Sequence, residues 1–169
     1  MSGTVVWITG LPSSGKSTFA SRAARELSAR GRPVLKLDGD EVREALEPAP
    51  GYDPAGRDAF YRSLARLAGM AARQGLFVLV AATAPRGSQR AYAREVAPRF
   101  LEVFVDVPEQ ECARRDSKGL YARARAGEVT TLPGVGEPYE APRAPDVVAR
   151  GGLDLAALAA LLERLPESA

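Results

Sequence analysis

The stretch Gly10–Ser17, with the sequence GLPSSGKS, constrains the fold of this chain more than any other. It fits the pattern G-x-x-x-x-G-K-[ST] and directly follows the apolar run Val5–Thr9. In such a loop the glycines let backbone N–H groups point inward at phosphate oxygens, and the following helix adds its positive N-terminal end. Apolar residues at helical spacing follow the loop, namely Phe19, Ala20, Ala23, Ala24 and Leu27. The sequence therefore predicts a phosphate-binding loop between a buried strand and an amphipathic helix.

The residue types in this loop predict a nucleoside triphosphate with magnesium as its ligand. Lys16 is expected to reach the β- and γ-phosphates, and the Ser17 hydroxyl is expected to hold Mg²⁺. The alternative is a Gly- and Ser-rich turn without a ligand, which the coincidence of strand, motif and helix disfavours. ATP and Mg²⁺ are therefore the expected cofactors. The predicted nucleotide-binding residues in the loop are Gly10, Ser13, Ser14, Gly15, Lys16, Ser17 and Thr18.

Length and composition predict one domain spanning residues 1–169. A chain of 169 residues with 46% apolar residues is large enough for one hydrophobic core.

The formal charge of +2 does not require a nucleic acid partner. The N-terminus shows no charged and apolar leader, and no apolar run approaches the roughly 18 residues of a membrane span. We expect a cytoplasmic protein with a small-molecule substrate, without nucleic acid or membrane partners, and leave a homodimer open.

Histidine and cysteine usage limits the chemistry of the site. The chain has no histidine, so proton transfer and metal binding must depend on carboxylates. Cys112 is the only cysteine, which excludes an internal disulfide and a metal site built from several cysteines.

Apolar runs alternate with helical patterns along the chain, which predicts an α/β fold with a parallel sheet of about five strands and helices on both faces. The expected strands are Val5–Thr9, Pro33–Asp38, Leu76–Thr83, Phe100–Val107 and Asp146–Ala149. The expected helices are Lys16–Arg30, Asp40 to about Leu46, Pro54–Arg73, Gln89–Ala97, Pro108 to about Arg115, and Leu153–Leu165. With the phosphate loop, this order predicts a P-loop NTPase fold. Asp116–Pro145 lacks clear periodicity and is rich in Gly and Pro, so we expect a mobile lid at about 116–145.

Two carboxylates end the second predicted strand, at Asp38 and Asp40. Ligands of such sheets bind beyond the carboxyl ends of the strands, so both side chains should lie near the phosphate loop. The third predicted strand ends in Ala81-Ala82-Thr83 and supplies no carboxylate. Asp38 and Asp40 are thus the best candidates to orient Mg²⁺ or to take a proton from an acceptor hydroxyl. The alternative for each is that it only caps the next helix.

The chain resembles the adenylyl-sulfate kinases, which use MgATP to phosphorylate the 3′ hydroxyl of adenosine 5′-phosphosulfate. The resemblance runs from Val5 to Val148 and includes the phosphate loop. It also includes Leu37-Asp38-Gly39-Asp40 with Arg43 and Leu46, Gly51-Tyr52 with Arg57 and Arg62, and the run Leu101–Pro108. Its most specific segments are Lys118-Gly119-Leu120-Tyr121 and Pro138-Tyr139-Glu140-Ala141-Pro142.

The resemblance implies a role for each matching residue. Asp40 would be catalytic, close to the attacking hydroxyl, and would bind the metal together with Ser17. Arg115, from the edge of the lid, would join Lys16 at the nucleotide. Tyr52 stands where the family usually has a Phe that stacks on the acceptor adenine. The substrate-binding set is Asp38, Arg43, Tyr52, Arg57, Arg62, Lys118 and Leu132, in which the three arginines address the phosphosulfate and Lys118 belongs to the lid.

The acceptor side departs from the family pattern. Gly56, Phe60 and Ser63 replace a usual Asp, Asn and Arg, Ala84 replaces a Ser, and Leu132 replaces the lid Phe. An unpaired polar group left by such a change costs roughly 1–3 kcal/mol. We expect an adenylyl-sulfate kinase. The alternatives are a kinase of the same family with another phosphorylated or nucleotide-like acceptor, and a nucleotide-binding domain without catalysis.

Overall fold

A parallel sheet of five strands, in the order β2-β3-β1-β4-β5, forms the centre of the computed structural model, which describes residues 1–167. The strands are β1 (Val5–Thr9), β2 (Val34–Asp38), β3 (Phe77–Ala81), β4 (Phe100–Val105) and β5 (Val147–Ala149). The helices are α1 (Lys16–Ala29), α2 (Gly39–Ala45), α3 (Pro54–Arg73), α4 (Gly87–Val96), α5 (Glu109–Arg115), α6 (Leu120–Arg125) and α7 (Leu155–Arg164). The predicted parallel α/β sheet is confirmed.

The predicted strands and helices are all present, with ends that lie within two residues of those expected. The prediction missed α6, which lies inside the segment expected to lack regular structure. Its six residues are too few to show an apolar period, and it begins after Gly119, which adopts a left-handed conformation. No helix within residues 1–167 is both long and apolar enough to cross a membrane.

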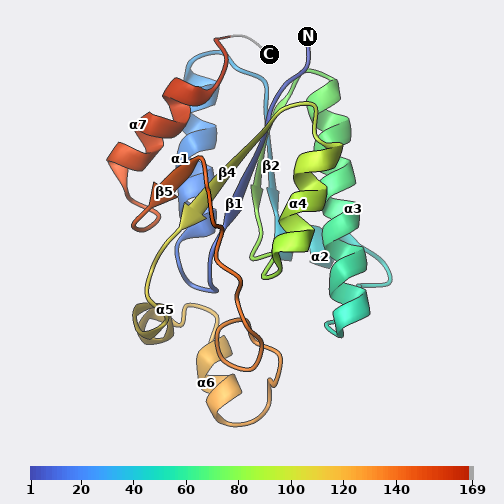
Figure 1. Cartoon of the computed structure of the whole chain (residues 1–169), viewed down its shortest axis with the longest axis vertical. Helices are drawn as coiled ribbons and strands as arrows, with labels where there is room; N and C mark the ends of the chain where they lie inside the picture. The colour runs from blue at the N-terminus through green and yellow to red at the C-terminus, as the bar shows by residue number, and fades with distance from the viewer. Residues whose placement is uncertain (168–169) are drawn as a thin grey trace.

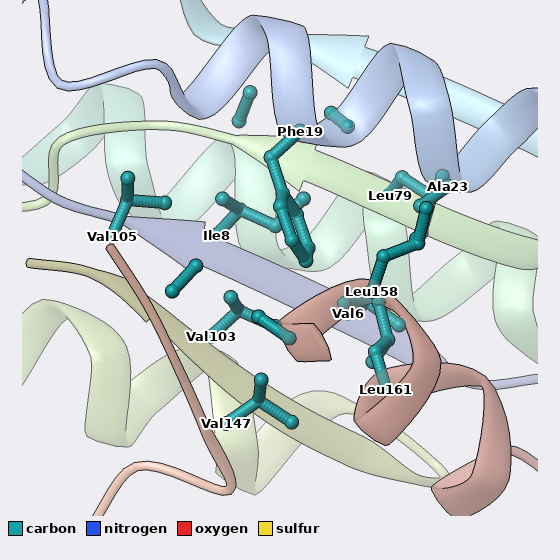
Figure 2. Close-up of a cluster of buried hydrophobic side chains, with 14 of the residues drawn as sticks. Val6, Ile8, Phe19, Ala23, Leu79, Val103, Val105, Val147, Leu158 and Leu161 are labelled. Atoms are coloured by element: carbon teal, nitrogen blue, oxygen red, sulfur yellow. The ribbon is translucent and has the colours of Figure 1, made fainter. Parts of the chain in front are cut away.

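Two hydrophobic clusters cover the two faces of the sheet. On one face, α1 and α7 pack over Val6 and Ile8 of β1 (Figures 1 and 2). On the other face, α3 and α4 pack over Val5 and Trp7. Successive side chains of a strand point to opposite faces, and every residue of β1 is buried. This double burial holds β1 in the middle of the sheet, between β3 and β4.

The carboxyl ends of the strands meet at one edge of the sheet, where α2, α5 and α6 also lie (Figure 1). The chain runs from β1 outward to β2, returns to β3, and then continues on the other side of β1 with β4 and β5. The order therefore changes direction beside β1, which is the place where ligands bind to open parallel sheets.

A buried arginine fastens the chain that returns from the lid. Arg90 of α4 lies 3.3 Å from a carboxylate oxygen of Glu102 in β4 and donates to the carbonyl oxygens of Ala84, at 2.6 Å, and Glu140. The Glu140 carboxylate accepts from the Gly87 backbone N–H at 2.7 Å. Burial raises the pKa of Glu102, and the charge of Arg90 opposes that rise. This network ties residues near 140 to the carboxyl edge of the sheet.

We expect Arg90→Met to lower the free energy of unfolding by about 3–5 kcal/mol, because it leaves the Glu102 carboxylate buried and unpaired. Urea denaturation measures the change. The double variant Arg90→Met/Glu102→Leu should recover part of the loss, since it removes both charges. The matched control is Arg94→Met on the same helix, whose half-exposed side chain lies 3.6 Å from Asp146. Equal losses for Arg90→Met and Arg94→Met would contradict the prediction.

Candidate active site

The phosphate loop connects the end of β1 to the start of α1. Gly15 precedes α1 with a φ of 105°, and no side chain caps the first N–H groups of the helix. A Cβ atom at Gly15 would lie 2.6 Å from the backbone nitrogen of Gly152, so the loop before α7 packs closely against the phosphate loop. The Ser14 hydroxyl is buried and has no hydrogen-bond partner within residues 1–167. These donors without partners fit a phosphate group as ligand.

Lys16 supplies positive charge at the centre of the loop. Its Nζ donates to the carbonyl oxygen of Leu11 at 2.8 Å. The pKa of Lys16 is lowered to about 7, mainly by desolvation and in second place by the positive charge of Lys118. No ion pair neutralises Lys16 within the described part of the chain. Lys16 and Lys118 thus share this site, and Lys16 has no direct carboxylate partner there. Such a site attracts an anion with several negative charges.

The two aspartates after β2 have different partners. The Ser17 hydroxyl donates to Asp38 Oδ2 at 2.5 Å, and Asp38 Oδ1 accepts from the Asp40 backbone N–H at 3.0 Å. Asp38 is thus the N-cap of α2 and also the carboxylate beside the phosphate loop. The Asp40 carboxylate instead forms an ion pair with Lys118. The structure therefore joins Ser17 to Asp38, whereas the sequence predicted that Ser17 and Asp40 would share the metal.

Oxygen ligands for Mg²⁺ are available on this side of the site. The Ser17 hydroxyl and the Asp38 carboxylate are both of the kind that Mg²⁺ takes when it also binds phosphates and water. No group of three or more His, Cys, Asp or Glu side chains that could hold a metal ion occurs in residues 1–167. The residues present therefore fit a metal that arrives with a phosphate ligand rather than one held by the protein alone.

The chain contacts the phosphate loop between the C-terminal end of α5 and the first turn of α6, where the predicted lid begins. The Tyr121 hydroxyl donates to the Pro12 carbonyl oxygen at 2.9 Å, and the hydroxyls of Ser13 and Ser117 lie 3.1 Å apart. Arg115 Nη1 donates to the Ser14 carbonyl oxygen at 3.5 Å. Arg115 is therefore beside the loop, where the sequence predicted it.

The lid also has its own local support. The Asp116 carboxylate accepts from the backbone N–H groups of Tyr121, at 2.9 Å, and Ala122, at 3.0 Å. These bonds satisfy the N-terminus of α6, although Gly119 is its N-cap and supplies no side chain. Lys118 lies between Asp116 and α6, so this local structure holds it opposite Asp40.

Arg43 of α2 lies between two aromatic side chains on the acceptor side of the site. Its Cζ is 4.3 Å from the ring centre of Tyr52 and 4.2 Å from that of Phe60. Arg43 is 8% exposed, Phe60 is 4% exposed, and Tyr52 is 61% exposed. The structure thus brings Tyr52 and Arg43 into contact, although the resemblance assigns them to different parts of the acceptor, and it adds Phe60 from α3.

Arg57 lies in a network of charges between α3, α4 and the lid. Arg57 forms an ion pair with Glu137, and the Glu137 carboxylate also lies 3.7 Å from Arg86. Arg86 in turn lies 3.6 Å from Asp58. The sequence reasoning missed Glu137. No local signal pairs it with Arg57, since 80 positions separate the two residues.

Burial raises the pKa of Tyr61, whose hydroxyl is also influenced by the charges of Arg57, Arg43 and Glu137. The charges of Arg57, Arg43 and Glu137 therefore all act on this phenol.

Two predicted substrate-binding residues lie elsewhere. Arg62 is exposed, and its Cζ lies 3.9 Å from the ring centre of Tyr92 in α4. Leu132 is 4% exposed and belongs to the hydrophobic cluster under α1 and α7. The structure does not bring Arg62 and Leu132 to the rings beside Arg43. The Arg62 side chain packs on an aromatic ring, and the Leu132 side chain packs among apolar residues.

Comparisons with known proteins agree with this geometry. A family model described as adenylylsulphate kinase matches residues 2–150. The adenylyl-sulfate kinase of Deinococcus deserti is 48% identical over 145 residues, which are 86% of this chain and 80% of the relative. The adenylyl-sulfate kinase of Chloroflexus aurantiacus is 44% identical over 164 residues, which are 97% of this chain and 87% of the relative.

A solved structure is also similar over nearly the whole chain. It is that of the Mycobacterium tuberculosis APS kinase CysC in complex with AMPPNP and APS. The two structures superimpose with a TM-score of 0.88 at 42% sequence identity, covering 96% of this chain and 98% of that chain. This likeness includes the parallel sheet and the helices on both of its faces.

We expect Lys16→Ala to weaken ATP binding roughly 10- to 100-fold, the scale of one lost hydrogen bond to a charged group. The fold should survive, because within residues 1–167 the Lys16 amine forms only the hydrogen bond to the Leu11 carbonyl oxygen. Isothermal titration calorimetry measures the affinity, and circular dichroism checks the fold. Lys36→Ala is the control, since Lys36 is exposed on β2 and bonds to Ser21. A folded Lys16→Ala variant with unchanged ATP affinity would contradict the assignment of the loop.

Proposed function

The chain belongs to the adenylylsulphate kinase family, and from this premise we propose that it transfers the γ-phosphoryl group of ATP to the 3′ hydroxyl of adenylyl sulfate. The observation that carries the proposal is the position of Lys118. It pairs with Asp40 and its charge acts on Lys16. Lys118, a lid residue, is thus close both to the phosphate loop and to Asp40, the carboxylate that we propose faces the acceptor.

The donor half of the reaction follows from the phosphate loop. Lys16 and the uncapped start of α1 bind the β- and γ-phosphates, and Arg115 approaches the same loop from the lid. Ser17 and Asp38 would hold Mg²⁺ against those phosphates. When bound, Mg²⁺ neutralises charge that develops on the phosphates during transfer. Lys16, Lys118 and Arg115 add fixed positive charge around the same atoms, which is the main work in phosphoryl transfer.

Asp40 takes the role of general base. The acceptor hydroxyl oxygen attacks the γ-phosphorus, the bond from the γ-phosphorus to the bridging oxygen breaks, and the hydroxyl proton passes to Asp40. Since the chain has no histidine, a carboxylate must do this work. The ion pair with Lys118 holds the Asp40 carboxylate in position beside the lid.

The acceptor itself is bound by Arg43, Arg57 and Tyr52. Arg43 and Arg57 supply charge to the phosphosulfate, and the charges of both act on the Tyr61 phenol. One face of the Tyr52 ring contacts Arg43, and the side chain is largely exposed. An adenine can stack on the exposed ring, an interaction worth about 1–3 kcal/mol per base. We assign no acceptor contact to Arg62, whose guanidinium lies over Tyr92, or to Leu132, which packs in a hydrophobic cluster.

Two carboxamide variants separate the roles of the two aspartates. Asp40→Asn should lower kcat by about 10² or more and leave ATP affinity nearly unchanged, because it removes the proton acceptor alone. Asp38→Asn should raise the Mg²⁺ concentration needed for half-maximal activity, because it removes a carboxylate beside Ser17. Steady-state kinetics over a magnesium series measures both effects. The roles are wrong if the two variants show the same change in kcat and in magnesium dependence.

The proposed function is tested by ADP release in the presence and absence of adenylyl sulfate. We expect release that depends on adenylyl sulfate, with one 3′-phosphoadenylyl sulfate formed for each ADP, as measured by chromatography. A panel of other phosphorylated metabolites serves as the comparison. If the protein turns over another compound and not adenylyl sulfate, the family assignment stands and the proposed acceptor is wrong. ATP binding without turnover of any acceptor would indicate a nucleotide-binding protein without catalysis.

A further inference from the structure

Arg43 is a buried cation without a carboxylate partner. Its Nη1 donates to the carbonyl oxygens of Pro50, at 2.9 Å, and Gly51, at 3.3 Å. No ion pair forms at Arg43 among residues 1–167, although the residue is only 8% exposed. A buried charge is normally paired because desolvation is costly. The surroundings of Arg43 must therefore stabilise its charge in another way.

Two aromatic rings supply that stabilisation. Phe60 contacts the guanidinium from the buried side, and Tyr52 contacts it from the exposed side, each with a ring centre about 4 Å from Cζ. Aromatic rings attract a cation through their faces but carry no negative charge. The guanidinium is thus held in position while its positive charge stays available for an anion.

Arg43 differs in this respect from the other arginines expected on the acceptor side. The charge of Arg57 is offset by Glu137, and Arg62 lies over Tyr92 on the surface of α3 and α4. Of these three arginines, Arg43 is therefore the one that is buried and has no ion pair among residues 1–167. It is the best placed of the three to receive the anionic end of an acceptor.

Phe60 is itself held firmly. It is 4% exposed, packs in the cluster that covers β1 and β3, and lies 5.5 Å from the ring of Tyr61 at an angle of 59°. A ring that cannot move gives the guanidinium a fixed plane. Tyr52 cannot do this alone, because its side chain is largely exposed.

We propose that Phe60 is a positioning residue for the acceptor. It fixes the Arg43 guanidinium so that Arg43 binds the phosphosulfate, and Phe60 does not touch the acceptor itself. This inference rests on the proposed function. It assigns a role to a position where an aromatic ring stands in place of the amide usual in the family.

The test is Phe60→Leu, which removes the ring and keeps an apolar side chain. We expect the KM for adenylyl sulfate to rise between about 3-fold and 30-fold, the scale of a desolvated cation–π contact. The kcat and the KM for ATP should stay within about two-fold, because the lost interaction acts on acceptor binding alone. Phe60→Trp, which retains an aromatic face, should restore at least part of the acceptor affinity.

Leu64→Val is the matched control, since Leu64 is fully buried one turn further along α3 and belongs to the same cluster. It should lower the melting temperature without changing the KM for adenylyl sulfate. A second readout is the NMR signal of the Arg43 Nε–H group, whose ring-current shift should diminish in Phe60→Leu and persist in Leu64→Val.

The inference is overturned if Phe60→Leu lowers stability but leaves the KM for adenylyl sulfate unchanged, or if Leu64→Val raises that KM equally. It is also overturned if the Arg43 signal does not shift in Phe60→Leu. Failure of the proposed function gives a different result, in which the wild-type protein itself does not turn over adenylyl sulfate.

Discussion

The burial of β1 on both faces is the constraint on which the rest of the structure depends. Val6 and Ile8 pack under α1, and Val5 and Trp7 pack under α3, so the strand cannot leave the middle of the sheet. The phosphate loop begins where this strand ends. A loop at that place lies beside the change of direction in the strand order, with the ends of β3 and β4 as its neighbours.

The remaining parts of the site are attached to that fixed point by polar contacts. Asp38 joins the end of β2 to Ser17, and Tyr121 joins the lid to the loop. Arg90 and Glu102 fasten the chain that returns from the lid. The Ser17–Asp38 bond is exposed, whereas Arg90 and Glu102 are buried, so loss of a partner is more costly for Arg90 and Glu102. Arg57 finds its partner Glu137 in a distant part of the chain.

Local patterns predicted the helices, the strands and the position of the phosphate loop well. The continuous apolar run of β1, the motif Gly10–Ser17 and the capped start of α3 at Pro54 each depend on neighbours within a few residues. The placement of Asp38 and Asp40 near the loop followed from the rule that parallel strands end at one edge. Helical spacing alone does not decide burial: Leu67 follows Phe60 and Leu64 at helical spacing in α3 and yet is 40% exposed.

The sequence by itself determined the parallel sheet, the phosphate loop and the position of two aspartates at the end of a strand. Apolar runs, glycine spacing and residue chemistry are local properties, so they can be recognised without the tertiary structure. Only the tertiary structure decided which aspartate meets Ser17, which residue offsets Arg57, and which rings hold Arg43. Glu137 reaches Arg57 across 80 positions, and Phe60 reaches Arg43 from another helix. Such pairings depend on how the helices and the lid pack against the sheet. Many residues contribute to the free energy of that packing, so no single sequence motif predicts it.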